Sequence, residues 1–199
     1  MTRLILIRHG QSIWNAENRF TGWTNVELSE KGELEALEAG KTLAQIKIDG
    51  VYTSDLVRAQ RTAEIVMDNN EVSSNFPTYC DYRLNERNYG ELQGLNKTET
   101  AEKHGAEQVH IWRRSYDIAP PGGESLEMTA ARTIPYFIRK IMPELISGKN
   151  ILISAHGNSL RSIVMHIENI SPEDIVSVEI PTGIPRFYQY NDGIITKDE

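Results

Sequence analysis

Two segments of this chain share one pattern, in which a short apolar run is followed by a histidine and a glycine. They read LILIRHG at residues 4–10 and ILISAHG at residues 151–157. Short, continuously apolar runs of this kind predict strands that are buried on both faces of a parallel sheet. Ligands bind just beyond the carboxyl ends of such strands. If the two strands are neighbours, His9 and His156 therefore lie in one pocket.

The remaining pattern predicts strands that alternate with helices. Strands are expected at residues 50–53, 78–80, 175–180, 186–190 and 194–196. Helices are expected after Ser29 as N-cap, after Asp55 as N-cap, at 98–104, at 107–114, over 124–146 with a bend at Pro135, and from Ser159 to about residue 168. In the first of these helices, Leu34, Leu37, Gly40 and Ala44 are expected to form the apolar face, and in the second Leu56, Ala59, Ala63 and Val66. The pattern indicates an α/β fold in three layers, with a mostly parallel central sheet flanked by helices, in a single catalytic domain over residues 1–199.

Composition restricts the partners of the chain. The net charge is -7 over 199 residues, which argues against general binding to nucleic acids or anionic membranes, so an anionic ligand must be attracted by a local group of arginines. Cys80 is the single cysteine, which excludes an intramolecular disulfide and favours a reducing, cytoplasmic location. No metal-ligand spacing is present, no apolar stretch reaches the ~18 residues of a membrane helix, and the apolar run at residues 4–7 is too short for a secretory signal.

Phosphoryl transfer is the chemistry that these residues suit best. A neutral imidazole attacks phosphorus if its other nitrogen donates a fixed hydrogen bond, and the backbone of Gly10 allows a close contact of this kind beside His9. Arg8 and Arg58 provide planar cations for the phosphate oxygens, and His156 adds a third contact. Arg61 follows three residues later and could take the place of Arg58. Resemblance to a family whose motif places the phosphate arginine just before an alanine favours Arg58, which precedes Ala59, and leaves Arg61 as a solvated charge on a helix surface.

An ordered set of motifs gives the chain a family resemblance. The resemblance extends from residue 4 to about residue 188. Its motifs are LIRHGQS at 6–12, WN at 14–15, RFTGW at 19–23, LNER at 84–87 with YG at 89–90, LQGLNK at 92–97, WRR at 112–114 and HGNSLR at 156–161. They resemble the histidine phosphatase superfamily and, within it, the cofactor-dependent (2,3-bisphosphoglycerate-dependent) phosphoglycerate mutases. Gln11 and Asn88 depart from the pattern, at positions that carry no chemistry.

The resemblance implies a glycolytic and gluconeogenic isomerase that interconverts 2-phosphoglycerate and 3-phosphoglycerate. His9 would carry the phosphoryl group and 2,3-bisphosphoglycerate would prime it, without a metal. Glu86 matches the family's acid–base carboxylate, with a pKa that burial beside an anionic substrate is expected to raise. The family also makes a homodimer or a homotetramer plausible.

The same resemblance predicts the substrate-binding residues. Lys97, Arg113 and Arg114 match residues for a second anionic group, and plain phosphatases of the superfamily generally lack these two motifs. The predicted catalytic residues are His9, Glu86, His156, Arg8 and Arg58. The predicted substrate-binding residues are Arg8, Gly10, Gln11, Ser12, Asn15, Thr21, Gly22, Arg58, Glu86, Arg87, Tyr89, Lys97, Arg113, Arg114, Gly157 and Asn158. Trp14, Trp23 and Trp112 are expected to be pocket walls, and His104, His110 and His166 to be structural.

Two other functions remain open at this point. One is a histidine-type phosphatase that hydrolyses small phosphate esters through the same intermediate, and the other is a non-catalytic module that binds phosphorylated ligands.

Two segments are shorter than in many members of the family. Only Ser115–Gly123 lies between Arg114 and Glu124, where longer mutases carry roughly two dozen more residues, and the chain ends at Glu199, where many relatives continue into a mobile tail. A shorter lid would admit more water, so some phosphatase leakage is expected.

Overall fold

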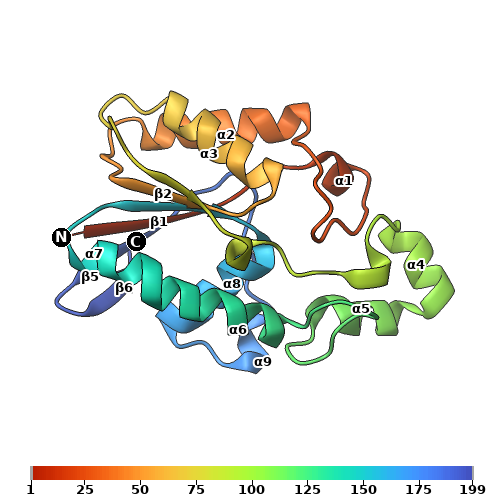
Figure 1. Ribbon diagram of the computed structural model, residues 1–199. Helices are drawn as coiled ribbons and strands as arrows, with labels where there is room; N and C mark the ends of the chain where they lie inside the picture. Colours follow the sequence, from red (N-terminus) through yellow and green to blue (C-terminus); the bar gives the residue numbers. More distant parts are fainter. Residues whose placement is uncertain (1, 199) are drawn as a thin grey trace.

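A six-stranded sheet forms the centre of the computed structural model, which describes residues 2–198 (Figure 1). The strand order is β3-β2-β4-β1-β5-β6. The strands are β1 (Thr2–Arg8), β2 (Gly50–Thr53), β3 (Thr78–Cys80), β4 (Ile151–Ala155), β5 (Arg186–Asn191) and β6 (Ile194–Lys197). The four strands from β3 to β1 are parallel, and β5 runs antiparallel to β1. The mostly parallel sheet is therefore confirmed.

Helices cover both faces of this sheet, which confirms the three layers. On one face α2 (Glu30–Leu43) and α3 (Val57–Asp68) enclose a core with Ile5 and Ile7 of β1. On the other face α6 (Leu126–Tyr136), η3 (Phe137–Ile141), α7 (Met142–Ile146) and α8 (Gly157–Glu168) enclose Leu4 and Leu6. Alternate residues of β1 thus serve opposite cores, as the period of two in a strand requires.

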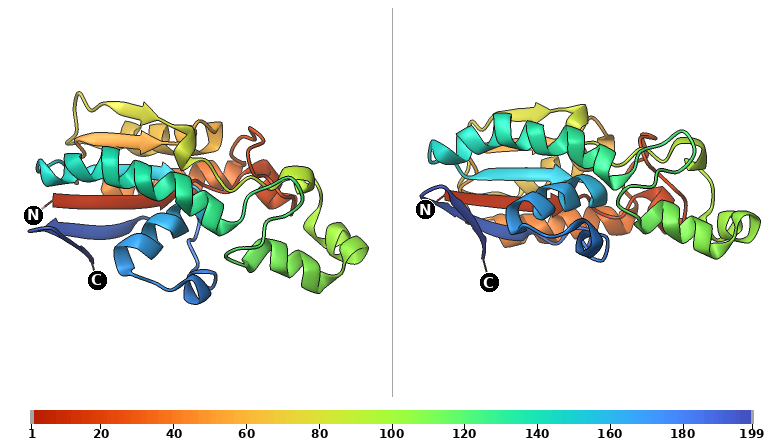
Figure 2. Two further views of the ribbon diagram at one scale, coloured as in Figure 1. Left: turned by 60° about the horizontal axis from the view of Figure 1, so that its bottom comes forward. Right: turned by 90° about the horizontal axis from the view of Figure 1, so that it is seen from below.

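The shorter elements gather beyond the carboxyl ends of the parallel strands. They are α1 (Ile13–Ala16), η1 (Tyr82–Leu84), η2 (Gly90–Leu92), α4 (Lys97–His104), α5 (Ala106–Arg114) and α9 (Pro172–Ile175). Figure 2 shows α4 and α5 extending past the sheet at this end in both views. This is the end at which His9 and His156 leave their strands. Within residues 2–198, no helix is long and apolar enough to cross a membrane.

Several predicted helix boundaries and faces were wrong. Asp55 does not cap α3, because Leu56 is the N-cap and its amide donates to Ser54 Oγ (3.1 Å). The helix after β4 begins at Gly157 rather than Ser159, since the Ser159 hydroxyl accepts from the backbone of the N-cap His156. Leu34 is exposed, and the buried residues of α2 are instead Gly32, Ala36, Ala39, Gly40 and Leu43.

The predicted strand over residues 175–180 is also wrong. Ser171 caps the short helix α9 by accepting a hydrogen bond from the backbone N–H of Asp174, and Pro172 fits its first turn. Residues 176–180 then run as an irregular segment against the site. The long helix over 124–146 begins at Leu126 after the Ser125 cap, and it contains the π-helical turn η3 between Pro135 and Pro143. A proline has no backbone N–H and so cannot make the i→i−4 hydrogen bond of an α-helix. A π turn between two prolines is consistent with this interruption.

Candidate active site

The pairing of β1 with β4 brings the two histidines together. Arg8 is in register with Ala155, and the amide of His9 extends the ladder by donating to Ala155 O (3.0 Å). The next residues, His9 and His156, have ring centroids 4.9 Å apart at an angle of 61°. Both side chains are buried. The repeated strand–histidine–glycine pattern therefore produces one site from two distant segments.

His9 is held as a neutral imidazole with its lone pair on Nε2. Its Nδ1 lies 2.6 Å from Gly10 O, and Arg58 Nε donates to its Nε2 over 3.3 Å. A carbonyl oxygen only accepts, so the proton is on Nδ1 and the lone pair is on Nε2. Burial, and then the positive charges of Arg58 and Arg8, lower the pKa of His9 well below 6.5. This protonation state is the one that a nucleophilic role for His9 Nε2 requires at neutral pH.

Glycine at position 10 is required by close packing. A Cβ atom there would lie 2.1 Å from the carbonyl oxygen of Gly32 in α2. The amide of Gly10 donates to Thr62 Oγ1 (3.1 Å), which fixes the turn after β1 to α3. This turn positions the carbonyl that orients His9.

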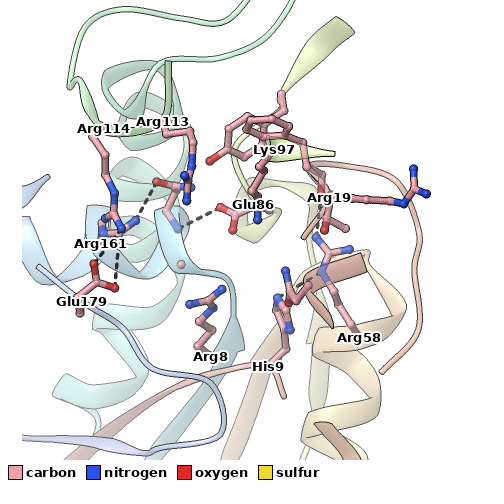
Figure 3. A pocket seen from close by; sticks show the side chains of 17 residues that line it. Arg8, His9, Arg19, Arg58, Glu86, Lys97, Arg113, Arg114, Arg161 and Glu179 are labelled. Carbon is pink, nitrogen blue, oxygen red and sulfur yellow. Dashed lines mark hydrogen bonds and ion pairs between the residues drawn. The ribbon is translucent and has the colours of Figure 1, made fainter. Parts of the chain in front are cut away.

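Two arginines from different elements lie on either side of His9 (Figure 3). Arg58, in the first turn of α3, is buried and donates to Gly22 O (2.7 Å) and Thr24 O (3.0 Å). Burial lowers its pKa to about 10, so it remains charged at neutral pH. Arg8 donates through Nη1 to Ile180 O (2.9 Å), while its buried Nε has no partner within the described chain.

Ser54 is hydrogen-bonded to His156, a contact that the sequence analysis did not assign. Its Oγ accepts from the Leu56 amide and lies 2.7 Å from His156 Nε2. In the tautomer in which this hydroxyl donates to Nε2, the imidazole proton is on Nδ1; in the other tautomer, Nε2–H donates to the second lone pair of the hydroxyl. That buried Nδ1 has no partner among residues 2–198. Burial first, then Arg58 and His9, lower the pKa of His156 well below 6.5.

Glu86 lies opposite the histidines, and its pKa is lowered although the side chain is buried. Burial favours the neutral acid. The charge of Arg8 and hydrogen bonds from the amides of Arg87 (2.8 Å) and Asn158 (3.0 Å) outweigh burial, so the pKa of Glu86 lies below 4.5. Glu86 is therefore a carboxylate at neutral pH, and the raised pKa expected beside an anionic substrate stays a prediction.

Arg132 of α6 anchors the loop that carries Glu86. Its guanidinium donates to four backbone carbonyls within residues 82–86, those of Tyr82 (3.3 Å), Arg83 (3.0 Å), Asn85 (3.0 Å) and Glu86 (2.9 Å). It is also paired with Glu124 at 2.9 Å, and both side chains are mostly buried. Glu124 in turn accepts from the Asn88 amide (2.9 Å). The sequence analysis missed this pair, because its partners are backbone atoms that carry no sequence signal.

A cavity of about 180 Å³ opens above His9 and is strongly cationic. It is lined by Arg8, His9, Asn15, Arg19, Phe20, Thr21, Gly22, Arg58, Glu86, Tyr89, Lys97, Arg113, Arg114, Gly157, Asn158, Arg161 and Glu179. Lys97, from the start of α4, and Arg113 and Arg114, from the end of α5, stand across the cavity from His9 (Figure 3). Burial, then the charge of Arg113, lower the pKa of Lys97. The cavity thus has one cationic group around His9 and a second on the opposite wall.

Most of the predicted site residues line this cavity, and the others surround it. Those that do not line it are Gly10, Gln11, Ser12, Arg87 and His156. Ser12 caps α1, the Gln11 amide donates to Glu35, and Arg87 donates to Tyr89 Oη (2.9 Å) and Arg113 O (2.7 Å).

The sequence analysis did not assign four of the lining residues, namely Arg19, Phe20, Arg161 and Glu179. The first three stand inside quoted motifs, which was the available signal, whereas Glu179 stands in none. No tryptophan lines the cavity, contrary to expectation, although Trp23 Nε1 donates to Glu86 O (2.5 Å) from behind it. Arg61 is at the surface as expected, paired with Glu33 and Glu64.

Comparisons with known proteins agree on one family. The model of the histidine phosphatase superfamily (branch 1) matches residues 4–193. A protein from Cytophaga hutchinsonii is 53% identical over 191 positions, covering 96% of this chain and 89% of the relative. One from Protochlamydia amoebophila is 49% identical over 217 positions, covering 96% of both. Both are named 2,3-bisphosphoglycerate-dependent phosphoglycerate mutase. The second alignment is longer than this chain, so that relative carries residues that have no counterpart here.

Solved structures show the same fold at lower identity. YhfR of Bacillus stearothermophilus is 27% identical, with a TM-score of 0.85, and covers 99% of this chain and 95% of its own. From the family match and from relatives of about 50% identity along nearly the whole chain, this chain belongs to the histidine phosphatase superfamily and, within it, to the 2,3-bisphosphoglycerate-dependent phosphoglycerate mutases.

Proposed function

We propose that this enzyme interconverts 2-phosphoglycerate and 3-phosphoglycerate through a phosphoryl group carried on His9, with 2,3-bisphosphoglycerate as the priming substrate. The observation that carries the proposal is the state of His9, which is buried, neutral and protonated on Nδ1, with its Nε2 lone pair at the base of a cationic cavity. The lone Cys80 and the acidic composition agree with a cytoplasmic location.

Priming is an attack of His9 Nε2 on one phosphorus of 2,3-bisphosphoglycerate. The N–P bond forms as the P–O bond to the glycerate breaks, and the leaving oxygen takes a proton from Glu86. Binding of an anion offsets the charges of Arg8 and Arg58, which hold the pKa of Glu86 down in the free protein, and so raises that pKa. The expected raised pKa of Glu86 thus becomes a property of the complex.

The isomerisation repeats this step in both directions. A hydroxyl of the bound monophosphate attacks the phosphorus on His9, Glu86 takes the hydroxyl proton, and Nε2 recovers its lone pair. The resulting bisphosphate turns in the cavity, and His9 then attacks its other phosphate while Glu86 returns the proton. Atoms and charges balance, and one phosphoryl group remains on His9.

The cations around His9 stabilise the group in transfer. Arg8 Nε and His156 Nδ1 are both buried without partners in the described chain, which is costly unless a ligand accepts from them. Two oxygens of a transferring phosphoryl group would satisfy these donors, and Arg58 supplies further charge. This fit supports phosphate as the ligand of the inner part of the cavity.

The opposite wall suits the second anionic group of a phosphoglycerate. Lys97, Arg113 and Arg114 line the cavity there, and Arg161 extends the cationic wall. Asn15 and Thr21 supply neutral polar groups between the two cationic parts, and Thr21 Oγ1 is buried without a partner in the described chain. A plain phosphomonoester would bring no second anionic group to Lys97 and Arg113.

The deciding assay couples formation of 2-phosphoglycerate from 3-phosphoglycerate to a spectroscopic signal, with and without 2,3-bisphosphoglycerate, while released phosphate is recorded. We expect stimulated isomerisation with minor phosphate release, an acid-labile phosphate on the protein, and loss of all three in His9→Gln. Phosphate release without isomerisation would instead establish a phosphatase. Binding without either reaction, and without an acid-labile phosphate, would establish a non-catalytic module.

A further inference from the structure

The irregular segment that follows α9 contacts three arginines of the cavity. Its backbone carbonyls accept hydrogen bonds from Arg114 Nη1 at Val176 (3.3 Å), from Arg161 Nε at Val178 (2.7 Å) and from Arg8 Nη1 at Ile180 (2.9 Å). Residues 176–180 are therefore fixed beside the cavity, and Glu179 lines it.

Glu179 places a carboxylate on this wall, among the cations. Its Oε1 lies 2.9 Å from Arg114 Nη2 and its Oε2 lies 3.8 Å from Arg161 Nη2 (Figure 3). Its side chain is 68% exposed, unlike the buried Glu86, which is the other carboxylate that lines the cavity. Glu179 therefore offsets part of the positive charge of the wall.

We propose that Glu179 is a specificity-determining residue that weakens the binding of bisphosphates relative to monophosphates. The inference rests on the proposed function, in which one phosphate lies at His9 and the other anionic group lies at the outer wall. A monophosphoglycerate presents a carboxylate to that wall, whereas the bisphosphate presents an additional phosphate with up to two charges. Repulsion from Glu179 grows with the charge of the ligand, and Glu179 also competes for Arg114 and Arg161.

This discrimination has a purpose in the proposed cycle. The bisphosphate must leave its first set of contacts and turn before its other phosphate reaches His9. When the bisphosphate leaves Arg114 and Arg161, the Glu179 carboxylate can pair with them in its place. This lowers the free-energy cost of breaking the contacts between the ligand and these arginines. The enzyme then avoids holding the bisphosphate in one orientation.

The test measures the dissociation constants of 3-phosphoglycerate and 2,3-bisphosphoglycerate by calorimetry in His9→Gln protein, which cannot accept a phosphoryl group. Adding Glu179→Gln should tighten binding of the bisphosphate about tenfold and of the monophosphate about threefold, because the repulsion that is removed grows with the charge of the ligand. The difference should shrink at high salt, because the Glu179 side chain is largely exposed.

Glu38→Gln is the matched control. Glu38 is 70% exposed and forms an ion pair with Lys41 on α2, so the substitution makes the same change in charge and breaks a comparable pair away from the cavity. It should leave both constants unchanged. If the His9→Gln background does not fold, the ratio of the activation constant for 2,3-bisphosphoglycerate to the KM for 3-phosphoglycerate gives the same comparison with His9 intact.

Three results would overturn the proposal: unchanged constants, an equal shift for both ligands, or weaker binding after Glu179→Gln. The last would mean that Glu179 holds Arg114 and Arg161 in place for the ligand. Binding is measured without turnover. Absence of isomerase activity in the parent protein would therefore refute the proposed function, while the two dissociation constants could still be compared.

Discussion

Acidification should destabilise this protein through its two buried histidines. The pKa values of His9 and His156 are both lowered well below 6.5, by burial first and then by the neighbouring charges. Below pH 6.5 the unfolded chain therefore binds two protons that the folded protein excludes. The stability is fully present above that pH and is lost as the pH falls towards the lowered values. Each histidine contributes a slope of about 1.4 kcal/mol per pH unit, so the pair gives about 2.7.

This slope is large compared with the ~5–15 kcal/mol of a typical domain. Urea unfolding at pH 7.5, 6 and 5 measures it, and the interval from pH 6 to 5 is the most informative. The pKa of Glu86 is also lowered, from 4.5, so its contribution is lost only below this interval and does not confuse the measurement. His9→Gln should reduce the slope by about half, to ~1.4 kcal/mol per pH unit.

His110→Gln, at an exposed position of α5, is the control for the loss of a histidine outside the site. Its slope should match that of the parent protein. A parent slope below about 1 kcal/mol per unit between pH 6 and 5 is less than one neutral histidine provides, and would show that both buried imidazoles take up protons in the folded state. The argument for a neutral nucleophile would then fail.

Three further substitutions test the framework of the site. Ser54→Ala removes the hydrogen bond to His156 Nε2 and lets the imidazole adopt either tautomer, so kcat should fall about tenfold. The Nδ1–H signal of His156 in nitrogen NMR should weaken. An unchanged signal would exclude this role for Ser54. Arg132→Ala should cost about 3–5 kcal/mol in urea unfolding and lower kcat more than it raises KM, because four loop carbonyls and Glu124 lose their donor. Arg132→Lys should recover only part of kcat, and full activity in the alanine variant would refute the anchoring of Glu86. Gly10→Ala should fail to give folded protein by circular dichroism, because its Cβ would lie 2.1 Å from a backbone oxygen, and a folded, active variant would refute the packing argument.

The central part of the fold could be predicted because each strand there is a continuous apolar run. Ile5 and Ile7 serve one core and Leu4 and Leu6 the other, and no other element type accommodates that pattern in so few residues. The segment 175–180 was mistaken for a strand because its alternation of apolar and polar residues is genuine. The Ser171 cap and Pro172 stabilise a helical turn immediately before it, and the carbonyls beyond pair with arginines instead of a neighbouring strand.

The site could be predicted to the extent that its chemistry resides in side chains of recognisable motifs. His9, Arg8 and Arg58 follow from the sequence because imidazole and guanidinium groups near strand ends have few alternative uses. Ser54 and Arg132 do not, because one acts through a tautomer and the other through backbone carbonyls of a distant loop. The shifted pKa of Glu86 depends on two backbone amides, whose direction only the folded chain defines.

The ladder between β1 and β4 sets the interval between the two imidazoles by backbone hydrogen bonds rather than by side-chain packing. Parallel strands lie at a nearly constant spacing of ~4.8 Å, so point substitutions leave this interval almost unaltered. Heritable variation in substrate preference can then come from α4, α5 and residues 176–180, which lie outside this ladder. A directed-evolution library for new phosphate esters should randomise those three segments and leave the strand ends untouched.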